Sequence, residues 1–224
     1  MNMKKKLVAG GLVACLGATL IGGATLVYFT DNEEASNTFT VGNVGIDLFE
    51  TKVQKVHDKW EFVPDDAHVE GNTYEGVYPG ATLPKDPTVT LDAGSSNAYV
   101  RMKVTFTNGD AWQAAGVEDL RTLVSASIDP AKWSVDDGVM ELATGDITFT
   151  YTYQDMLVDA EGQNSTDRLF DSVYIPAYLD GEDMAAIAEG GNFQINIKAE
   201  AIQADGFDSA AEAFTAMDNM GDQG

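Results

Sequence analysis

The chain has 224 residues, 44% of them hydrophobic, and its 36 acidic residues outnumber 13 basic ones to give a formal net charge of −23. This hydrophobic fraction is typical of a globular protein rather than of a disordered chain. All acidic residues follow Thr30, so the chain from Tyr28 onward has ten basic and 36 acidic residues, a net charge of −26. Such a charge excludes nucleic-acid binding and docking on an anionic membrane, because both need clustered Lys and Arg.

The first 30 residues have the pattern of an export signal. Residues 1–6 form a short basic region with Lys4, Lys5 and Lys6, and residues 7–29 carry no charge. This pattern predicts a cleaved signal peptide, whereas the length of the hydrophobic run also allows an uncleaved membrane anchor. Cys15, the single cysteine, satisfies the bare pattern of a lipoprotein signal, although the residues after it remain apolar. If cleavage falls after Cys15, the mature chain has no disulfide.

Beyond Asp31, hydrophobic residues alternate with polar ones, which is typical of β-strands. Many short strands separated by turn residues predict an all-β fold of two packed antiparallel sheets in one domain. Phe39 and Val41 are followed out of phase by Val44, Ile46 and Leu48, as expected for a bulge at Gly42-Asn43. Further strands are predicted at 88–91, 98–107, 139–142, 147–153, 172–175 and 193–202.

Three short helical insertions and several turns interrupt these strands. Helices are predicted over 116–126, around Met184 and Ile187, and over 207–217, where Ser209 and Glu212 have the spacing of a capping box. Asn108-Gly109 predicts a hairpin turn after the strand at 98–107. Residues 52–78 are polar, and an irregular segment is predicted there.

Several short blocks of sequence are distributed over nearly the whole chain: Met3-Lys4-Lys5-Lys6, Gly22-Gly23-Ala24-Thr25, Tyr28-Phe29-Thr30-Asp31, Asn37-Thr38-Phe39, Gly45-Ile46-Asp47-Leu48, Tyr78-Pro79-Gly80, Lys85-Asp86-Pro87, Ala98-Tyr99-Val100-Arg101, Leu169-Phe170-Asp171-Ser172-Val173 and residues 199–207. In combination, these blocks closely resemble the secreted TasA/camelysin group of Gram-positive bacteria. The resemblance implies a jelly-roll-like antiparallel β-sandwich, preceded by an N-terminal hydrophobic signal helix. It also implies a SipW-type signal peptidase that separates residues 1–27 from a single domain at 28–224. The expected scissile bond is Val27–Tyr28, with Ala24–Thr25 as the second choice.

The resemblance further implies a secreted structural protein, the subunit of an extracellular matrix or surface fibre in a biofilm. In TasA-like fibres the mature N-terminal segment leaves its own subunit and completes a sheet in the next. The strand-forming stretch 38–48 follows an acidic leader at 31–36, which favours it as the donor. Its buried residues would be Phe39, Val41, Val44, Ile46 and Leu48. The alternative is that this strand pairs within its own subunit.

The charge sets conditions on such head-to-tail assembly. Subunits that each carry −26 repel one another unless protons, salt or divalent cations reduce the field. We therefore expect low pH, high ionic strength or Ca²⁺ to promote assembly. The acidic loops at 136–137, 159–167 and 180–183 lack the EF-hand spacing, so only weak Ca²⁺ binding is expected, and no cofactor is predicted.

Relatives classed as metallopeptidases supply an enzyme alternative. Zinc peptidases bind metal through closely spaced ligands, most simply two histidines one helical turn apart with a Glu between them. Here the only histidines are His57 and His68, and no His-Glu-x-x-His motif exists. They could join Asp65, Asp66 or Glu70 in a metal site, but solvated loop histidines are the favoured interpretation, and catalysis is not expected.

A monomeric cell-surface protein that binds a ligand is the other alternative. Phe149, Tyr151 and Tyr153 alternate with threonines, which places three aromatic rings on one face of a strand. These rings could contact a glycan or another subunit, but packing in the core is the favoured interpretation.

Overall fold

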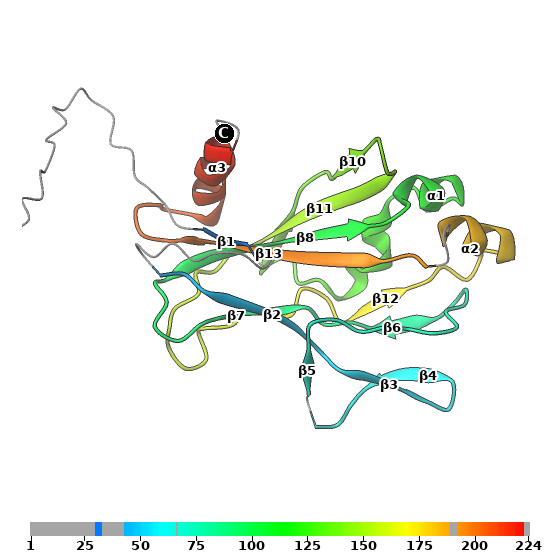
Figure 1. The fold of residues 1–224 in the computed structure, drawn as a ribbon. Helices are drawn as coiled ribbons and strands as arrows, with labels where there is room; N and C mark the ends of the chain where they lie inside the picture. Colours follow the sequence, from blue (N-terminus) through cyan, green and yellow to red (C-terminus); the bar gives the residue numbers. More distant parts are fainter. Residues whose placement is uncertain (1–29, 33–42, 66, 189–191, 222–224) are drawn as a thin grey trace, which may run out of the picture.

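A computed structural model describes residues 30–32, 43–65, 67–188 and 192–221 of the protein (Figure 1). Its strands are β1 (Thr30–Asn32), β2 (Ile46–Thr51), β3 (Val53–Val56), β4 (Lys59–Phe62), β5 (His68–Val69), β6 (Thr82–Pro84), β7 (Thr88–Leu91), β8 (Ala98–Phe106), β9 (Trp133–Val135), β10 (Val139–Glu141), β11 (Asp146–Tyr153), β12 (Ser172–Tyr174) and β13 (Ile195–Gln203). Its helices are α1 (Gly109–Ala114), α2 (Gly181–Ile187) and α3 (Ala210–Gly221), with 3₁₀ turns η1 (Leu120–Leu123) and η2 (Ser125–Ser127).

The larger sheet has the order β1-β13-β8-β11-β10, and β9 also pairs with β11. All its pairings are antiparallel, and β13 runs beside β8 along its whole length, from Ile195 opposite Phe106 to Gln203 opposite Ala98. Strand β8 is the centre of this sheet, since seven of its nine residues are buried. The all-β prediction is confirmed, because antiparallel strands dominate the described residues.

A second layer lies across the larger sheet. It contains the strand sets β5-β2-β7 and β12-β6, while the β3–β4 hairpin projects below it in Figure 1. No described helix is long and apolar enough to span a bilayer. The predicted signal helix and the cleavage bond at Val27–Tyr28 lie outside the described residues.

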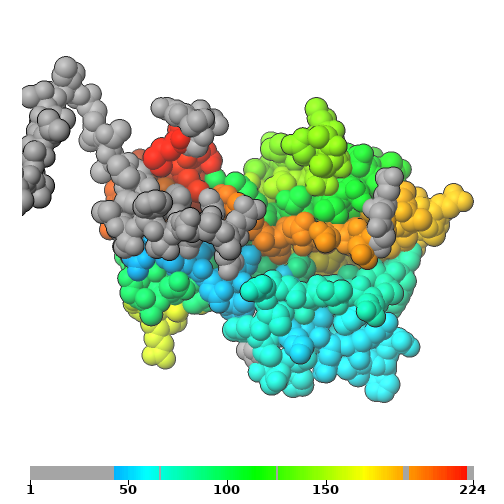
Figure 2. Space-filling view, in the orientation of Figure 1, coloured from blue at the N-terminus to red at the C-terminus, as the bar shows by residue number. Residues whose placement is uncertain are grey.

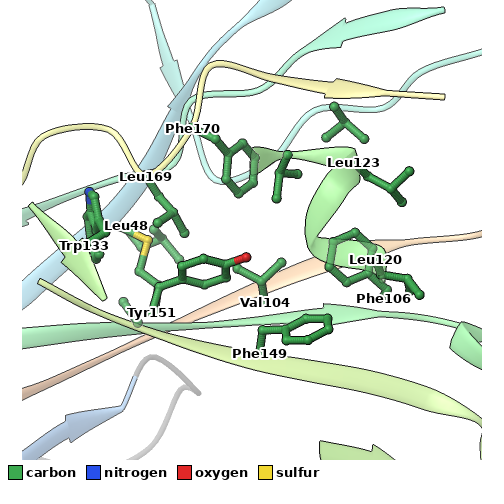
Figure 3. Packing of buried hydrophobic residues seen from close by; sticks show 14 of the residues in the cluster. Leu48, Val104, Phe106, Leu120, Leu123, Trp133, Phe149, Tyr151, Leu169 and Phe170 are labelled. Carbon is green, nitrogen blue, oxygen red and sulfur yellow. The ribbon is translucent and has the colours of Figure 1, made fainter. Parts of the chain in front are cut away.

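The hydrophobic core fills the space between the two layers. Figure 3 shows Val104 and Tyr151 of the larger sheet close to Leu48 of β2 and to Leu169, which comes from the connection before β12. Along β11 the burial alternates, with Phe149, Tyr151 and Tyr153 buried and the threonines between them half-buried. The predicted core role of these aromatic rings is therefore confirmed.

Strand prediction succeeded for the predicted strands from residue 88 onward, whereas residues 52–78 were predicted wrongly as irregular. They contain the β3–β4 hairpin, in which Val56 pairs with Lys59 across a two-residue turn. His57 and Asp58 form this turn with φ of 48° and 61°, the left-handed values that such a turn requires. The sequence His57-Asp58 differs from the Asn-Gly or Asp-Gly pair that usually forms such a turn.

Two other local predictions were wrong. Asn108-Gly109 does not turn into a hairpin but begins α1, with Asn108 at φ 53° as the residue before the helix. Gly109 is required there because a Cβ would lie 2.5 Å from Ile147 Cγ1. Residues 116–126 form 3₁₀ turns instead of an α-helix, with the Asp119 carboxylate accepting a hydrogen bond from the Arg121 N–H.

The remaining helices were predicted correctly in position. Helix α2 contains Met184 and Ile187 and begins at a capping box formed by Asp180 and Asp183. At the start of α3, the Ser209 hydroxyl accepts a hydrogen bond from Glu212 N–H at 3.3 Å. The Glu212 carboxylate accepts one from Asp208 N–H at 3.0 Å, one residue earlier than a capping box requires.

Candidate functional site

The structure divides the predicted donor strand into two parts. Ile46 and Leu48 are buried in the core of their own subunit, where β2 pairs them with Leu91 and Val89 of β7, and Val44 packs half-buried against the same core. These three residues therefore follow the alternative of pairing and packing within the subunit. Phe39 and Val41 lie outside the described residues, and their donor role stays a prediction.

The described residues closest to the N-terminus form an edge strand. In β1, Thr30, Asp31 and Asn32 pair with Ile202, Ala201 and Glu200 of β13. The structure thus adds the start of the predicted mature chain to the outer edge of the larger sheet. Ten residues, 33–42, separate this short strand from Asn43.

A cluster of charged side chains lies on the face of the sheet beside β1. Arg101 Nε donates a hydrogen bond to Glu200 Oε2 at 2.6 Å, and Lys103 Nζ donates one to Glu200 Oε1 at 2.8 Å. The two remaining Arg101 nitrogens donate to the Asp218 carboxylate of α3 at 2.8 and 2.6 Å. Arg101 and Glu200 face each other across β8 and β13, and both are buried.

The cluster shifts the pKa values of Glu200, Arg101 and Asp218 so as to favour their charged forms. Burial by itself would raise the pKa of Glu200, but hydrogen bonds from Lys103 and Arg101 outweigh it and lower the pKa. Burial by itself would lower the pKa of Arg101, but hydrogen bonds to Asp218 and Glu200 raise it. The hydrogen bond from Arg101 lowers the pKa of Asp218. Glu200, Arg101 and Asp218 are therefore charged at neutral pH.

Helix α3 completes this face of the sheet. Its Phe214 ring lies 4.6 Å from the Arg101 guanidinium carbon, in a cation–π contact. Around this contact, a small apolar cluster joins the helix to the sheet through Tyr99, Ile202, Ala204, Ala210, Ala213 and Phe214. Figure 1 shows α3 above the end of β13 at which β1 pairs. The cluster therefore fixes the C-terminal helix beside the N-terminal strand.

A second buried ion pair fixes β2 in the other layer. Lys85 Nζ donates to Glu50 Oε1, and the Thr51 N–H donates to Asp86 Oδ1 at 2.8 Å. Asn72 Nδ2 donates to Glu50 Oε2 at 3.1 Å, and its Oδ1 accepts from Val53 N–H at 2.9 Å. These contacts anchor the strand that contains Ile46 and Leu48 within its own subunit.

The two histidines lie in different elements of the structure. His57 occupies the β3–β4 turn, and His68 of β5 stacks on Phe49 with ring centroids 3.8 Å apart and an interplanar angle of 17°. Among the described residues, no group of three or more His, Cys, Asp or Glu side chains is arranged to hold a metal ion. Asp66 lies outside them. The described part of the chain therefore does not fit a zinc peptidase centre.

Carboxylates of the acidic loops accept hydrogen bonds from backbone N–H groups. Asp136 Oδ1 accepts hydrogen bonds from Gly138 N–H at 3.1 Å and Thr150 N–H at 2.9 Å. Asp159 Oδ2 accepts one from Gly94 N–H at 2.7 Å, and Asp180 caps α2. Weak Ca²⁺ binding by these loops stays a prediction.

Sequence reasoning did not find an open groove beside the β3–β4 hairpin. The groove has a volume of about 600 Å³ and is lined by half-buried Trp60, exposed Tyr78, Arg168 and Asp171, among other residues. The hairpin and the following strands form the cyan lower part of the surface in Figure 2. Aromatic and charged side chains in one groove are suited to a polar organic ligand.

Comparison with known proteins agrees with the resemblance of the N-terminal sequence. Residues 2–70 match the family model described as camelysin metallo-endopeptidase. The N-terminal third of the chain is camelysin-like. This camelysin-like segment contains the predicted signal, β1, β2 and both histidines, and it ends immediately after β5. No curated protein and no solved structure matches the chain.

Proposed function

We propose that this camelysin-like protein is a secreted, non-catalytic structural protein, a subunit of an extracellular matrix or surface fibre. Residues 1–27 would be removed by a SipW-type signal peptidase, leaving one domain at 28–224. The membrane would be contacted only through the uncleaved signal. The mature subunits would then bind head to tail, because the donated N-terminal segment and its acceptor are different surfaces, and such contacts produce open filaments.

One observation carries this proposal: the start of the predicted mature chain forms a separate edge strand. Strand β1 has three described residues, and within the described part of the chain it pairs only with β13; ten residues connect it to Asn43. Three residues of strand pairing bury little surface, so β1 can leave β13 at low cost. The donor segment therefore comprises residues before Asn43, with Phe39 and Val41 as its apolar side chains.

The test compares mature chains beginning at Tyr28 and at Asn43 by negative-stain microscopy. The shorter chain keeps Ile46 and Leu48, which the core needs, and its folding is checked by circular dichroism. We expect filaments from the longer chain and folded monomers from the shorter one. Filaments from both chains would show that the N-terminal segment is not the donor.

Paired substitutions sharpen this test within the full mature chain. The double variant Phe39→Asn and Val41→Asn removes the predicted apolar face of the donor, and we expect it to abolish filaments. The control variant Thr38→Asn and Thr40→Asn changes the opposite face and should assemble normally. Equal assembly of both variants would contradict burial of Phe39 and Val41 in an acceptor.

The groove beside Trp60 favours a second candidate function, a cell-surface protein that binds a ligand as a monomer. Its test is titration of the mature chain with soluble oligosaccharides while Trp fluorescence is followed. Saturable binding by the native chain that is lost in a Trp60→Ala variant would favour this function, provided that the variant remains folded.

A further inference from the structure

We propose that the outer edge of β13 is the acceptor for the N-terminal segment of a second copy of this chain, an inference that rests on the proposed fibre function. Strand β13 has nine residues, and β8 pairs with all of them. On its other side, β1 covers only Glu200, Ala201 and Ile202. Among the described residues, no strand pairs with the outer edge from Ile195 to Ala199. Figure 2 shows the orange surface of β13 along the visible face of the molecule.

The open stretch presents both backbone groups and apolar side chains to an added strand. Gln194 C=O accepts from Thr107 N–H at 3.0 Å, and Ala204 N–H donates to Asn97 C=O at 2.8 Å, so even-numbered residues face β8. Successive residues direct their backbone groups to opposite edges. The N–H and C=O groups of Ile195, Ile197 and Ala199 therefore point to the open edge.

Side-chain burial decreases along the same stretch. Ala199 and Ala201 are completely buried, whereas Ile195 and Ile197 are only half-buried although they pack against the main core. These four residues share the inner face of the sheet, because alternate residues of a strand lie on the same side. An added strand with two apolar side chains on this face would complete the burial of Ile195 and Ile197.

The chain's own N-terminal segment is too short to reach the Ile195 end of this stretch. Asn43 C=O accepts a hydrogen bond from Ser96 N–H at 2.7 Å, which places Asn43 beside the Ala204 end of β13. If this segment continued to pair with β13 in the register of β1, residue 37 would lie opposite Ile195. At about 3.3 Å per residue, Ile195 is about 30 Å from the Ala204 end of β13. Six residue steps then return to Asn43, and they span at most about 21 Å. A segment from a second copy has no such constraint.

The sequence 38–41 fits the open stretch in pattern and position. In β1, Asp31 is opposite Ala201, so odd-numbered residues of an incoming segment share the inner face. If the incoming segment is shifted by four residues relative to β1, its odd-numbered residues still share the inner face. Phe39 then lies opposite Ile197, and Val41 lies opposite Ile195. Both apolar side chains then cover the half-buried isoleucines.

The charges on the outer face are compatible with the same occupant. On the outer face Lys198 lies directly opposite Lys103, and Glu200 already binds Lys103 and Arg101. Lys198 has no carboxylate partner within the described part of the chain. In the proposed register the neutral residues Thr38 and Thr40 lie opposite Lys198 and Asn196, so the added strand brings no further positive charge to this face.

Disulfide capture tests the acceptor directly. The proposed register makes Thr40 and Asn196 a directly opposed pair that is not hydrogen-bonded, in which side chains are closest. Mature chains with Thr40→Cys and with Asn196→Cys are prepared separately and mixed under oxidising conditions. We expect a disulfide between the two variants, identified by peptide mapping. A Met140→Cys chain, altered on β10 at the far edge of the sheet, should not bond to Thr40→Cys.

A second pair of variants tests whether assembly needs this edge. Ile197→Lys places a charge on the inner face of β13 and should abolish filaments, whereas Asn196→Lys places the same charge on the outer face and should permit them. Thermal unfolding verifies that both variants fold. Filaments without the disulfide, or from Ile197→Lys, would overturn the β13 acceptor and leave the fibre function intact. Absence of both filaments and disulfide would overturn both proposals.

Discussion

Arg101 connects three separate parts of the chain, namely β8, β13 and α3, through one buried guanidinium group. Replacing it by Met would leave Glu200 buried with only Lys103 as a partner. Breaking a buried ion pair by removal of one partner costs about 3 kcal/mol or more. We expect Arg101→Met to lower the free energy of unfolding in urea by about this amount. The control is Lys132→Met, which breaks the exposed pair with Asp155 at 2.6 Å and should change stability little.

The carboxylate of Asp218 makes the free energy of unfolding depend on pH. Its pKa is lowered in the folded state by the hydrogen bond from Arg101. The stabilisation is therefore complete above the unfolded pKa of about 4 and is lost as pH falls below it through the folded value. We expect the Asp218→Asn variant to be less stable than the native chain at pH 7. Between about pH 4 and pH 2, the variant should lose less stability than the native chain does. Parallel stability curves for the two proteins would contradict this linkage.

Two tyrosines on one face of β11 differ in their hydroxyl groups. Tyr151 OH is buried without a hydrogen-bond partner among the described residues, whereas Tyr153 OH donates to Asp167 Oδ2 at 2.7 Å. We expect Tyr151→Phe to stabilise the protein by about 1 kcal/mol and Tyr153→Phe to destabilise it by a similar amount. Thermal unfolding measures both. Destabilisation by Tyr151→Phe would reveal a hydrogen bond that the structure lacks.

At the scale of elements, the turn before β10 depends on a glycine. Gly138 and Gly94 both have φ of +83°, but a Cβ at Gly138 would lie 2.5 Å from the Phe149 ring, while one at Gly94 would meet nothing within 4 Å. Gly94→Ala should therefore cost only the backbone strain, about 1 kcal/mol. We expect Gly138→Ala to cost about 1–3 kcal/mol more, because the ring must move. Equal unfolding midpoints for the two variants would contradict this packing.

The elements that the sequence predicts well are those with a strong local pattern. The aromatic–threonine alternation of β11 and the apolar stretch of β8 match the period of a strand, so both were found. The β3–β4 hairpin was missed because His57 and Asp58 are unusual turn residues. Helix α1 was missed because the left-handed Asn108 that begins it is equally typical of a hairpin turn.

The charged cluster illustrates what local sequence does not reveal. Arg101 and Glu200 are 99 residues apart, and only the pairing of β8 with β13 brings them together. The same pairing creates the edge on which β1 lies. Sequence reasoning placed the predicted donor at residues 38–48 and could not separate Phe39 and Val41 from the core residues Ile46 and Leu48, because strand periodicity does not show which subunit a strand joins.

At the scale of the whole molecule, charge should control the rate of assembly. The chain from Tyr28 onward carries −26, and screening shortens the range of its repulsion from about 30 Å at 0.01 M salt to about 10 Å at 0.1 M. We expect the assembly rate, followed by light scattering, to increase with NaCl, with acidification and with Ca²⁺. Sucrose at equal osmolality is the control. A rate that stays constant across these conditions would contradict electrostatic control.

The short connection between β1 and Asn43 also makes assembly a competition. A segment joined by only ten residues has a local effective concentration in the millimolar range, so β1 of the same subunit occupies its edge in dilute solution. In the register proposed above, residues 34–36 of an incoming segment lie opposite 202–200, so it can displace β1 because it pairs over more of β13 than three residues. If the protein forms the proposed fibre, nucleation should therefore be slow and elongation fast, and free subunits should remain single until they meet an existing filament end.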